Sequence, residues 1–189
     1  MPFSESLRAQ LLDTARRSIG HGLAKGQPLP VDPQQFGLPL NAAGASFVTL
    51  HIGEALRGCI GSLQAHRPLI CDVAENAFAA AFRDPRFPPL TKEELKSISL
   101  DISVLSQAER MVFDSEQDLV KRIRPGVDGL ILKDGNYRGT FLPSVWESLP
   151  DTGQFLKHLK LKAGLPSDHW SDTLEVWRYT TECFGDKDG

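Results

Sequence analysis

Apolar positions recur at helical spacing in two stretches of the chain. The first follows Ser4, a residue suited to capping a helix, and its apolar stripe consists of Leu7, Leu11, Leu12, Ala15 and Ile19. The second follows Pro68, and its apolar positions are Leu69, Ile70, Val73, Ala74, Ala77, Phe78, Ala81 and Phe82. Both patterns predict helices packed on a core. The second helix is the more apolar, so we expect it to be central and buried.

Apolar and polar residues alternate in other stretches, which predicts strands. Two β-prone runs flank Gly53, and two more flank Asp134-Gly135-Asn136, so we expect two hairpins, at 45–60 and 129–142. Regular alternation from Ile98 to Val104 predicts a half-buried strand, and a last strand is expected over 174–181. Shorter helices are expected at 115–123, 143–147 and 152–163, and after the capping pair Thr91 and Glu94. The polar tail 185–189 is expected to fray.

The order of these elements repeats along the chain. A hairpin, a helix started by proline and a single strand occur at 45–105 and again at 127–183. Each second hairpin strand carries an Arg-Gly pair, Arg57-Gly58 and Arg138-Gly139. We interpret this as two β-rich halves folded around a shared sheet, with the two Arg-Gly strands close in space; the alternative is a chance coincidence. The chain is then either one domain over 1–189 or two interlocked subdomains, about 1–110 and 111–189.

Composition excludes several classes of protein. A formal charge of -3 argues against a dedicated nucleic-acid binder, which needs a basic surface. The three cysteines form no CxxC pair, so we expect neither a disulfide framework nor a zinc site, and a reducing cytoplasm is the natural location. No apolar run is long enough to span a bilayer, and the first residues do not read as a signal peptide. The sequence predicts no metal or cofactor.

The candidate chemistry lies in the run LRGCIG, residues 56–61. Strand alternation places Cys59 and Arg57 on one face, where a cation would favour the reactive thiolate. His51 on the neighbouring strand could act as a base if the register brings it opposite Cys59. The alternative is that Cys59 is a small buried hydrophobe and Arg57 a surface or ion-pairing residue.

Two further groups of residues extend this candidate site. Gly58 and Gly61 could let backbone N–H groups approach an anionic ligand, or they could mark a bulge and a turn. Arg83, Asp84 and Arg86 follow the central helix in a loop rich in proline, where they could complete a pocket or tie the loop down as an ion pair.

Taken together, three motifs are similar to those of a known family. They are the run 47–61 ending in LRGCIG, the segment Asp84-Pro85-Arg86-Phe87-Pro88-Pro89-Leu90, and Gly139-Thr140-Phe141-Leu142-Pro143 with Val145-Trp146. The chain resembles the AMMECR-type domain family, in the bacterial and archaeal form called protein A of the AmmeMemoRadiSam system, over nearly its entire length. The resemblance implies an α+β fold with two β-α repeats around a mainly antiparallel, partly barrel-like sheet and helices outside.

The resemblance also implies partners, a Memo-like protein and a radical S-adenosylmethionine enzyme. Our first hypothesis is a cytosolic protein with a small anionic-ligand pocket, in which Cys59 is the nucleophile or redox centre and His51 a second catalytic candidate. Its ligand-binding candidates are Arg57, Gly58, Gly61, Arg83, Asp84, Arg86 and Arg138. The second hypothesis is a non-catalytic scaffold that docks the Memo-like partner. A regulatory role linked to nucleic acid is disfavoured by the charge.

Overall fold

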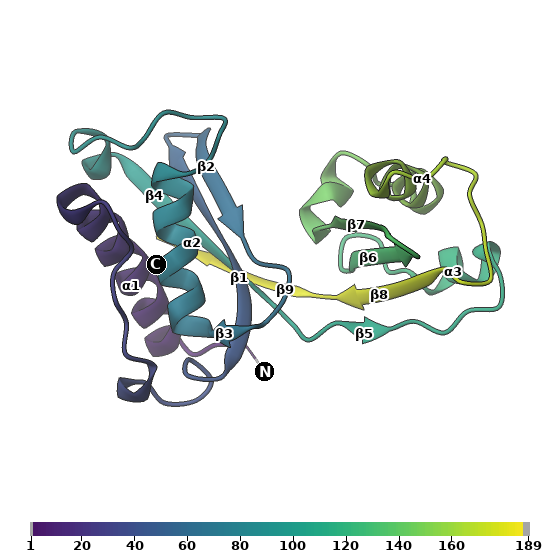
Figure 1. Ribbon diagram of the computed structural model, residues 1–189, viewed down its shortest axis with the longest axis horizontal. Coiled ribbons are helices and arrows are strands. Elements are labelled where there is room, and N and C mark those ends of the chain that lie inside the picture. Colours follow the sequence, from purple (N-terminus) through teal and green to yellow (C-terminus); the bar gives the residue numbers. More distant parts are fainter. Residues whose placement is uncertain (1, 187–189) are drawn as a thin grey trace. The chain divides into compact units, whose positions relative to one another are not determined.

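The computed structural model describes residues 2–186, which fold into two compact units (Figure 1). The first unit extends to Leu105 and also includes the chain from Glu182 onward, and the second is Ser106–Thr181. Each unit has its own hydrophobic core, built from its own strands and helices.

The first unit is a sheet with two helices on one of its faces (Figure 1). The strands run in the order β2-β1-β4-β9, and short β3 pairs with β1 beyond the β2 pairing. Their bounds are β1 Ala43–Ile52, β2 Ala55–Gly61, β3 Arg67–Pro68, β4 Ile98–Leu105 and β9 Thr181–Gly185. Helix α2 (Leu69–Phe82) packs on β1 and β2, and α1 (Glu5–Lys25) packs on α2.

Local signals in the sequence account for these elements. The Ser4 side chain accepts a hydrogen bond from the N–H of Leu7 at the start of α1, and the helix ends at Gly26, whose φ of 72° favours glycine. Alternate residues of β4 are buried, as the pattern predicted. Residues 33–35 form a 3-10 turn, η1 (Pro33–Gln35), in the connector between α1 and β1.

The second unit is a four-stranded antiparallel sheet in the order β5-β8-β6-β7. The strands are β5 Glu109–Arg110, β6 Gly129–Asp134, β7 Tyr137–Phe141 and β8 Glu175–Tyr179. Helix α4 (Thr152–Ala163) packs on β7 and β6, and α3 (Glu116–Arg122) contacts α4. The core gathers around Trp146 and Phe155, whose rings stack with centroids 3.7 Å apart.

The predicted α+β class and the two repeats are confirmed. In the first unit a hairpin, a helix and a strand give the sheet order β2-β1-β4, and in the second the same succession gives β7-β6-β8. The shared, partly barrel-like sheet is corrected. The described residues form two separate antiparallel sheets and no closed barrel, because each hairpin pairs with the strand that follows its own helix.

Close packing explains why glycine follows arginine in both repeats. A Cβ added at Gly58 would lie 2.1 Å from the carbonyl oxygen of Ala80 in α2. A Cβ added at Gly139 would lie 2.9 Å from the backbone nitrogen of Ala163 in α4. In both units the strand therefore needs glycine where its helix comes nearest.

Three other expectations are refined by the structure. The turns at Glu94–Lys96 (η2) and Pro143–Glu147 (η3) are 3-10 helices. The last strand is divided between β8 and β9, with Thr180 between them. Gly185 belongs to β9, and the Asp186 carboxylate accepts a hydrogen bond from the N–H of Leu100, so the predicted fraying does not begin at 185. The rest of that tail, 187–189, lies outside the described residues.

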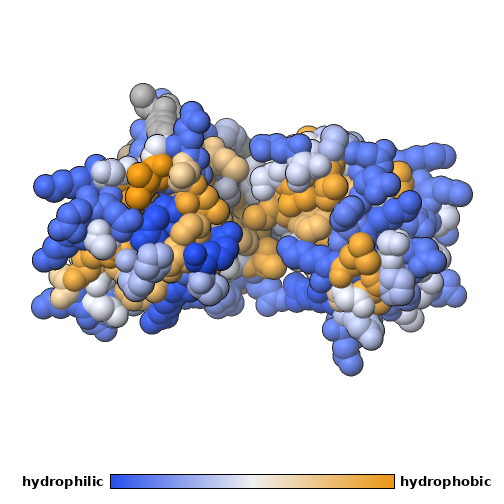
Figure 2. Space-filling model, turned by 90° about the horizontal axis from the view of Figure 1, so that it is seen from above, coloured by the Kyte–Doolittle hydropathy of each residue, from blue (hydrophilic) through white to orange (hydrophobic). Residues whose placement is uncertain are grey.

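The surface carries scattered apolar side chains. Figure 2 shows hydrophobic residues on both units, interrupted by hydrophilic ones. The large exposed hydrophobic side chains include Leu38, Leu56 and Leu63 in the first unit and Val112, Val127, Tyr137 and Leu161 in the second. Among the helices of residues 2–186, none combines the length and apolar character needed to cross a bilayer.

Candidate functional site

The LRGCIG run forms strand β2, which is an edge strand of the first sheet. The loop that follows α2 binds the backbone N–H and carbonyl oxygen of Cys59 on this edge. The N–H of Cys59 donates to Asp84 Oδ2 at 3.0 Å, and Arg86 Nη2 donates to the carbonyl oxygen of Cys59 at 3.4 Å. The loop thus covers the edge, which would otherwise be open to pairing with another chain.

Asp84 is the centre of this contact. Its side chain is 2% exposed and accepts hydrogen bonds from the backbone N–H, Nε and Nη2 of Arg86, at 3.1, 3.0 and 2.7 Å. The Arg86 guanidinium is the main cause that holds the pKa of Asp84 well below its usual range, and the N–H of Cys59 adds to it. Asp84 is therefore ionised at neutral pH, and it joins the strand, through the N–H of Cys59, to Arg86 of its own loop.

Arg57 is held by a second carboxylate in the same loop. Its Nε and Nη2 donate to Glu94 Oε1 and Oε2 at 2.8 and 3.1 Å, and Nη2 also donates to the carbonyl oxygen of Pro88 at 2.9 Å. Only 7% of Arg57 is exposed, and its Cζ lies 5.8 Å from the centre of the Phe87 ring. The geometry favours a structural role, because a ligand would have to displace Glu94 to reach the two bonded nitrogens.

Glu94 has two roles at this point. It completes the predicted capping box with Thr91: the Thr91 N–H donates to Glu94 Oε2 at 2.9 Å, and the Glu94 N–H donates to Thr91 Oγ1 at 3.3 Å. The same carboxylate binds Arg57, and that hydrogen bond is the largest cause lowering the pKa of Glu94 to about 2. One residue therefore joins the turn η2 to strand β2.

Acid should weaken this connection. The pKa of Glu94 is lower in the folded chain than the ordinary value of 4.5, so the unfolded chain binds more protons in acid. The stabilisation is complete above the ordinary pKa and is lost as the pH falls toward the folded one. We expect Glu94→Gln to be less stable than wild type at neutral pH, with a smaller difference near pH ~3. Urea unfolding at the two pH values measures this, and an equal difference at both would show that ionisation of Glu94 contributes nothing.

The face of the first sheet opposite α2 carries the polar candidates. In the β1–β2 register, Thr49 lies opposite Cys59, and its Oγ1 is 3.1 Å from Cys59 Sγ. In the β1–β4 register, Asp101 lies on the other side of Thr49. Cys59, Thr49 and Asp101 therefore form a row across three strands. Cys59 is half-buried at the end of this row.

The register does not place His51 opposite the thiol. A bulge shifts the pairing after Leu50, so that His51 lies opposite Leu56. Arg57 is the extra residue of the bulge and lies opposite no residue of β1 in this register. His51 Nδ1 lies instead 3.1 Å from Asp101 Oδ2. The Leu50–Gly58 pair lies between the strand positions of His51 and Cys59. A role for His51 as a base remains a prediction.

The bulge also changes which cation accompanies Cys59. Strict alternation would place Arg57 beside the thiol, but its guanidinium binds Glu94 and Pro88. Arg86 reaches Cys59 instead, since its Nη2 donates to the carbonyl oxygen of Cys59 at 3.4 Å. The pKa of Arg86 is raised chiefly by its hydrogen bond to Asp84, with a smaller contribution from Cys59. The structure thus brings together Cys59, Asp84 and Arg86.

Three remaining candidates lie elsewhere. The Arg83 guanidinium stacks over the ring of Phe78 in α2, 4.9 Å from its centre. A Cβ at Gly61 would lie 2.2 Å from the Phe47 ring, so this glycine makes room for an aromatic ring on the opposite strand. Arg138 lies in β7, in the sheet of the second unit, whereas Arg57 lies in the first.

A buried polar cluster anchors the end of the motif. Asp72 of α2 is fully buried and accepts hydrogen bonds from the Ser46 N–H and hydroxyl, the Ser62 hydroxyl and the Asn76 amide, at 2.8 to 2.9 Å. Arg67 Nε lies 3.2 Å from the same carboxylate. The cluster fixes the exit of β2 against β1 and α2, and sequence reasoning missed it.

Sequence reasoning also missed Thr49, Glu94 and Asp101 as members of the site. Asp101 was predicted on the polar face of its strand, but its nearness to His51 depends on how β1 and β4 pair. Thr91 and Glu94 were predicted as a capping pair. A capping pair is a local pattern, so it could not predict that Glu94 also binds Arg57. The missing information is in each case a contact between distant segments.

Comparison with known proteins identifies the family. A family model described as AMMECR1 matches residues 12–184. Protein MJ0810 of Methanocaldococcus jannaschii is 40% identical over 152 residues, covering 76% of this chain and 74% of that protein. A protein of Methanothermobacter thermautotrophicus is 38% identical over 192 residues, covering 97% and 96%.

A solved structure agrees with these relatives. The crystal structure of "Uncharacterized Protein PH0010" from Pyrococcus horikoshii matches with a TM-score of 0.81 and 34% sequence identity, covering 94% of this chain and 90% of that one. The resemblance seen in the sequence motifs is confirmed. The chain belongs to the AMMECR1 family.

Proposed function

We propose that Cys59 is the reactive group of a small-molecule site on the face of the first sheet opposite α2. The observation that carries the proposal is the setting of Cys59: Thr49 Oγ1 lies 3.1 Å from its Sγ, and Arg86 Nη2 donates to its carbonyl oxygen at 3.4 Å. A half-buried cysteine with a hydroxyl at its sulfur and a guanidinium at its backbone has surroundings that suit a reactive thiol. The ligand of this site is, on this proposal, a small anion.

Arg86 is suited to two tasks in such a site. Asp84 fixes its guanidinium through Nε and Nη2, while 53% of the side chain remains exposed. A cation close to a cysteine in general favours reaction of its thiol, and this guanidinium is also open to the charged group of an anionic ligand. His51, paired with Asp101 on the same face, is the candidate for moving a proton.

On the family resemblance we further propose that the protein acts in the cytoplasm with a Memo-like protein and a radical S-adenosylmethionine enzyme. Its free cysteines, Cys59, Cys71 and Cys183, suit a reducing compartment. The rival function is a scaffold that docks the Memo-like partner. Arg57 pairs with Glu94, and Asp84 pairs with Arg86. These two ion pairs favour the scaffold, because they give Arg57 and Asp84 a structural role.

The rate of alkylation by iodoacetamide, read for each cysteine by mass spectrometry, tests the reactive-thiol proposal. We expect Cys59 to react about tenfold faster than Cys183, although Cys183 is more exposed. Cys71 should react more slowly than either, since burial raises the pKa of its thiol. Arg86→Gln should slow Cys59 to the rate of Cys183.

Arg83→Gln is the matched control, because it removes a cation from the same loop whose guanidinium lies over Phe78. It should leave the rate at Cys59 unchanged. Cys71 in each sample reports on unfolding, which would raise its rate. If Cys59 reacts no faster than Cys183 in wild type, the reactive-thiol proposal fails and the scaffold is favoured.

A further inference from the structure

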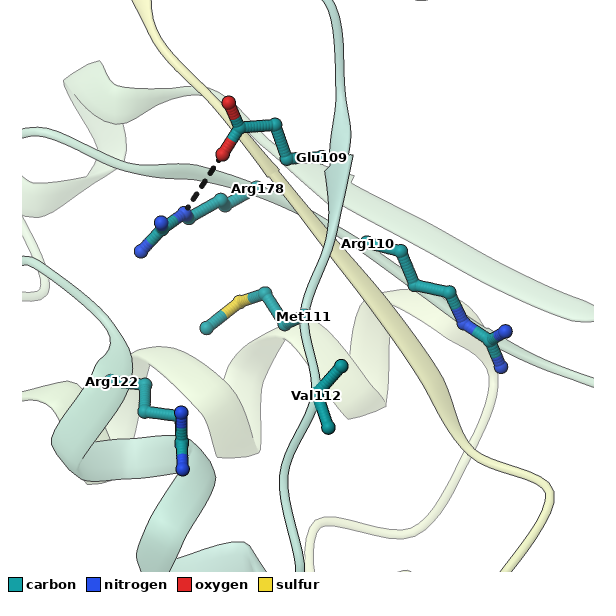
Figure 3. A pocket seen from close by; sticks show the side chains of 6 residues that line it. All are labelled: Glu109, Arg110, Met111, Val112, Arg122 and Arg178. Carbon is teal, nitrogen blue, oxygen red and sulfur yellow. Dashed lines mark ion pairs between the residues drawn. The ribbon is translucent and has the colours of Figure 1, made fainter.

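Two hollows of the second unit share three lining residues, Arg110, Met111 and Val112. Figure 3 shows one of them, with a volume of approximately 240 Å³, where Arg122 and Arg178 lie on the same side of the 109–112 segment as Met111. Arg122 pairs with Asp118 at 2.9 Å, and Arg178 approaches Glu109 at 3.5 Å. Each of these two arginines in the smaller hollow is therefore paired with a carboxylate of the protein. Neither leaves an uncompensated charge that would attract a ligand.

The other hollow is larger and differs in charge. Its volume is approximately 420 Å³, within the range of small-molecule sites. Its apolar lining residues are Met111, Val112, Phe113, Trp170 and Leu174. This wall would suit a ligand with an apolar body.

Two carboxylates at this hollow have no partner. Arg110 and Glu175, which both line it, pair at 2.8 Å and so balance each other. Asp114 and Asp172 also line it, and within residues 2–186 no hydrogen bond or ion pair engages either carboxylate. The hollow therefore has two uncompensated negative charges next to an apolar wall.

One aromatic residue of the wall, Trp170, already contacts a cation of the protein. The rings of Phe113 and Trp170 meet edge to face, with centroids 5.6 Å apart at 60°. The buried Lys160 Nζ lies over the Trp170 ring at 5.8 Å, so this indole already accepts a cation of the protein. Glu116 Oε1 lies 2.6 Å from that Nζ and compensates its charge. A second cation near the ring would therefore meet little net repulsion from Lys160.

We infer that this hollow binds a small organic ammonium ion. The ammonium group lies between Asp114 and Asp172, and the alkyl body contacts Met111, Leu174 and the rings of Phe113 and Trp170. This site belongs to the second unit alone and is independent of the proposed chemistry at Cys59.

Titration of the full chain with butylammonium, followed by the indole N–H resonance of Trp170 in a ¹H–¹⁵N spectrum, tests the inference. Trp170→Phe assigns the resonance among the three tryptophans. Butanol and butyrate, of similar size but without positive charge, are the matched probes. We expect a saturable shift with butylammonium and none with the other two.

The double variant Asp114→Asn, Asp172→Asn should weaken butylammonium binding about tenfold. Glu54→Gln with Glu147→Gln is its control, since both residues are exposed, neither lines the hollow, and the pair removes the same charge. The control should bind as wild type does. The inference is overturned if butylammonium gives no saturable shift, if butanol gives the same shift, or if the Asp114 and Asp172 variant binds unchanged.

Discussion

Gly58→Ala should lower the free energy of unfolding by about 3 kcal/mol or more, because the new Cβ would lie 2.1 Å from the carbonyl oxygen of Ala80. That oxygen belongs to the backbone of α2, so no side-chain rotation can relieve the overlap. The strand or the helix must move, and both belong to the core of the first unit. Urea unfolding measures the loss.

Gly20→Ala is the control for this substitution. Gly20 lies inside α1, and a Cβ added there would meet nothing within 4 Å. Alanine should therefore be neutral or stabilise the helix by about 0.5 to 1 kcal/mol. A loss at Gly58 no larger than the change at Gly20 would show that α2 and β2 are not in close contact.

Asp84→Ala is expected to cost about 3 kcal/mol, because it removes the acceptor for two backbone N–H groups and leaves Arg86 without its carboxylate. The exposed Arg86 can turn toward water, so most of the cost comes from the backbone groups. The amide of Cys59 should also exchange its hydrogen faster than in wild type. Global unfolding by urea and amide exchange at Cys59 are the two measurements.

Asp13→Ala controls for the loss of a carboxylate. Asp13 is exposed on α1 and lies 3.5 Å from Arg17, a type of surface pair that contributes little. Asp13→Ala should change the free energy of unfolding by no more than about 0.5 kcal/mol. If Asp84→Ala is equally mild, the loop does not seal the edge of β2.

Most of the fold could be predicted from the sequence, because its signals are local. The apolar stripe after Ser4, the central helix after Pro68 and the alternation in β4 each depend on residues a few positions apart. The repeat was visible for the same reason. The number of sheets could not be predicted, because it depends on which strands pair, and pairing joins residues that are far apart in the chain.

The candidate site was less predictable, and one bulge shows why. A strict period of two placed Arg57 beside Cys59, but the register shift after Leu50 removes Arg57 from the regular pairing. Its guanidinium then binds Glu94, and Arg86 becomes the cation near the thiol. Residue types alone identified Cys59, Asp84 and Arg86, and the ion pair of Asp84 with Arg86 was one of the predicted alternatives. The partners of Cys59 and Arg57 required the register.

The LRGCIG run therefore combines two tasks in adjacent residues. Arg57 and Gly58 hold the edge strand to the loop and to α2. Cys59 contributes to that structure through its backbone N–H, while its side chain lies half-buried beside Thr49 on the other face. On this account the thiol is dispensable for folding and available for chemistry.

Urea unfolding of Cys59→Ser tests that division most directly. Serine keeps the backbone bond to Asp84 and a hydroxyl beside Thr49, so the free energy of unfolding should stay within about 1 kcal/mol of wild type. A loss near the ~3 kcal/mol expected for Gly58→Ala would show that the sulfur is a packing element of the core, and would contradict the account.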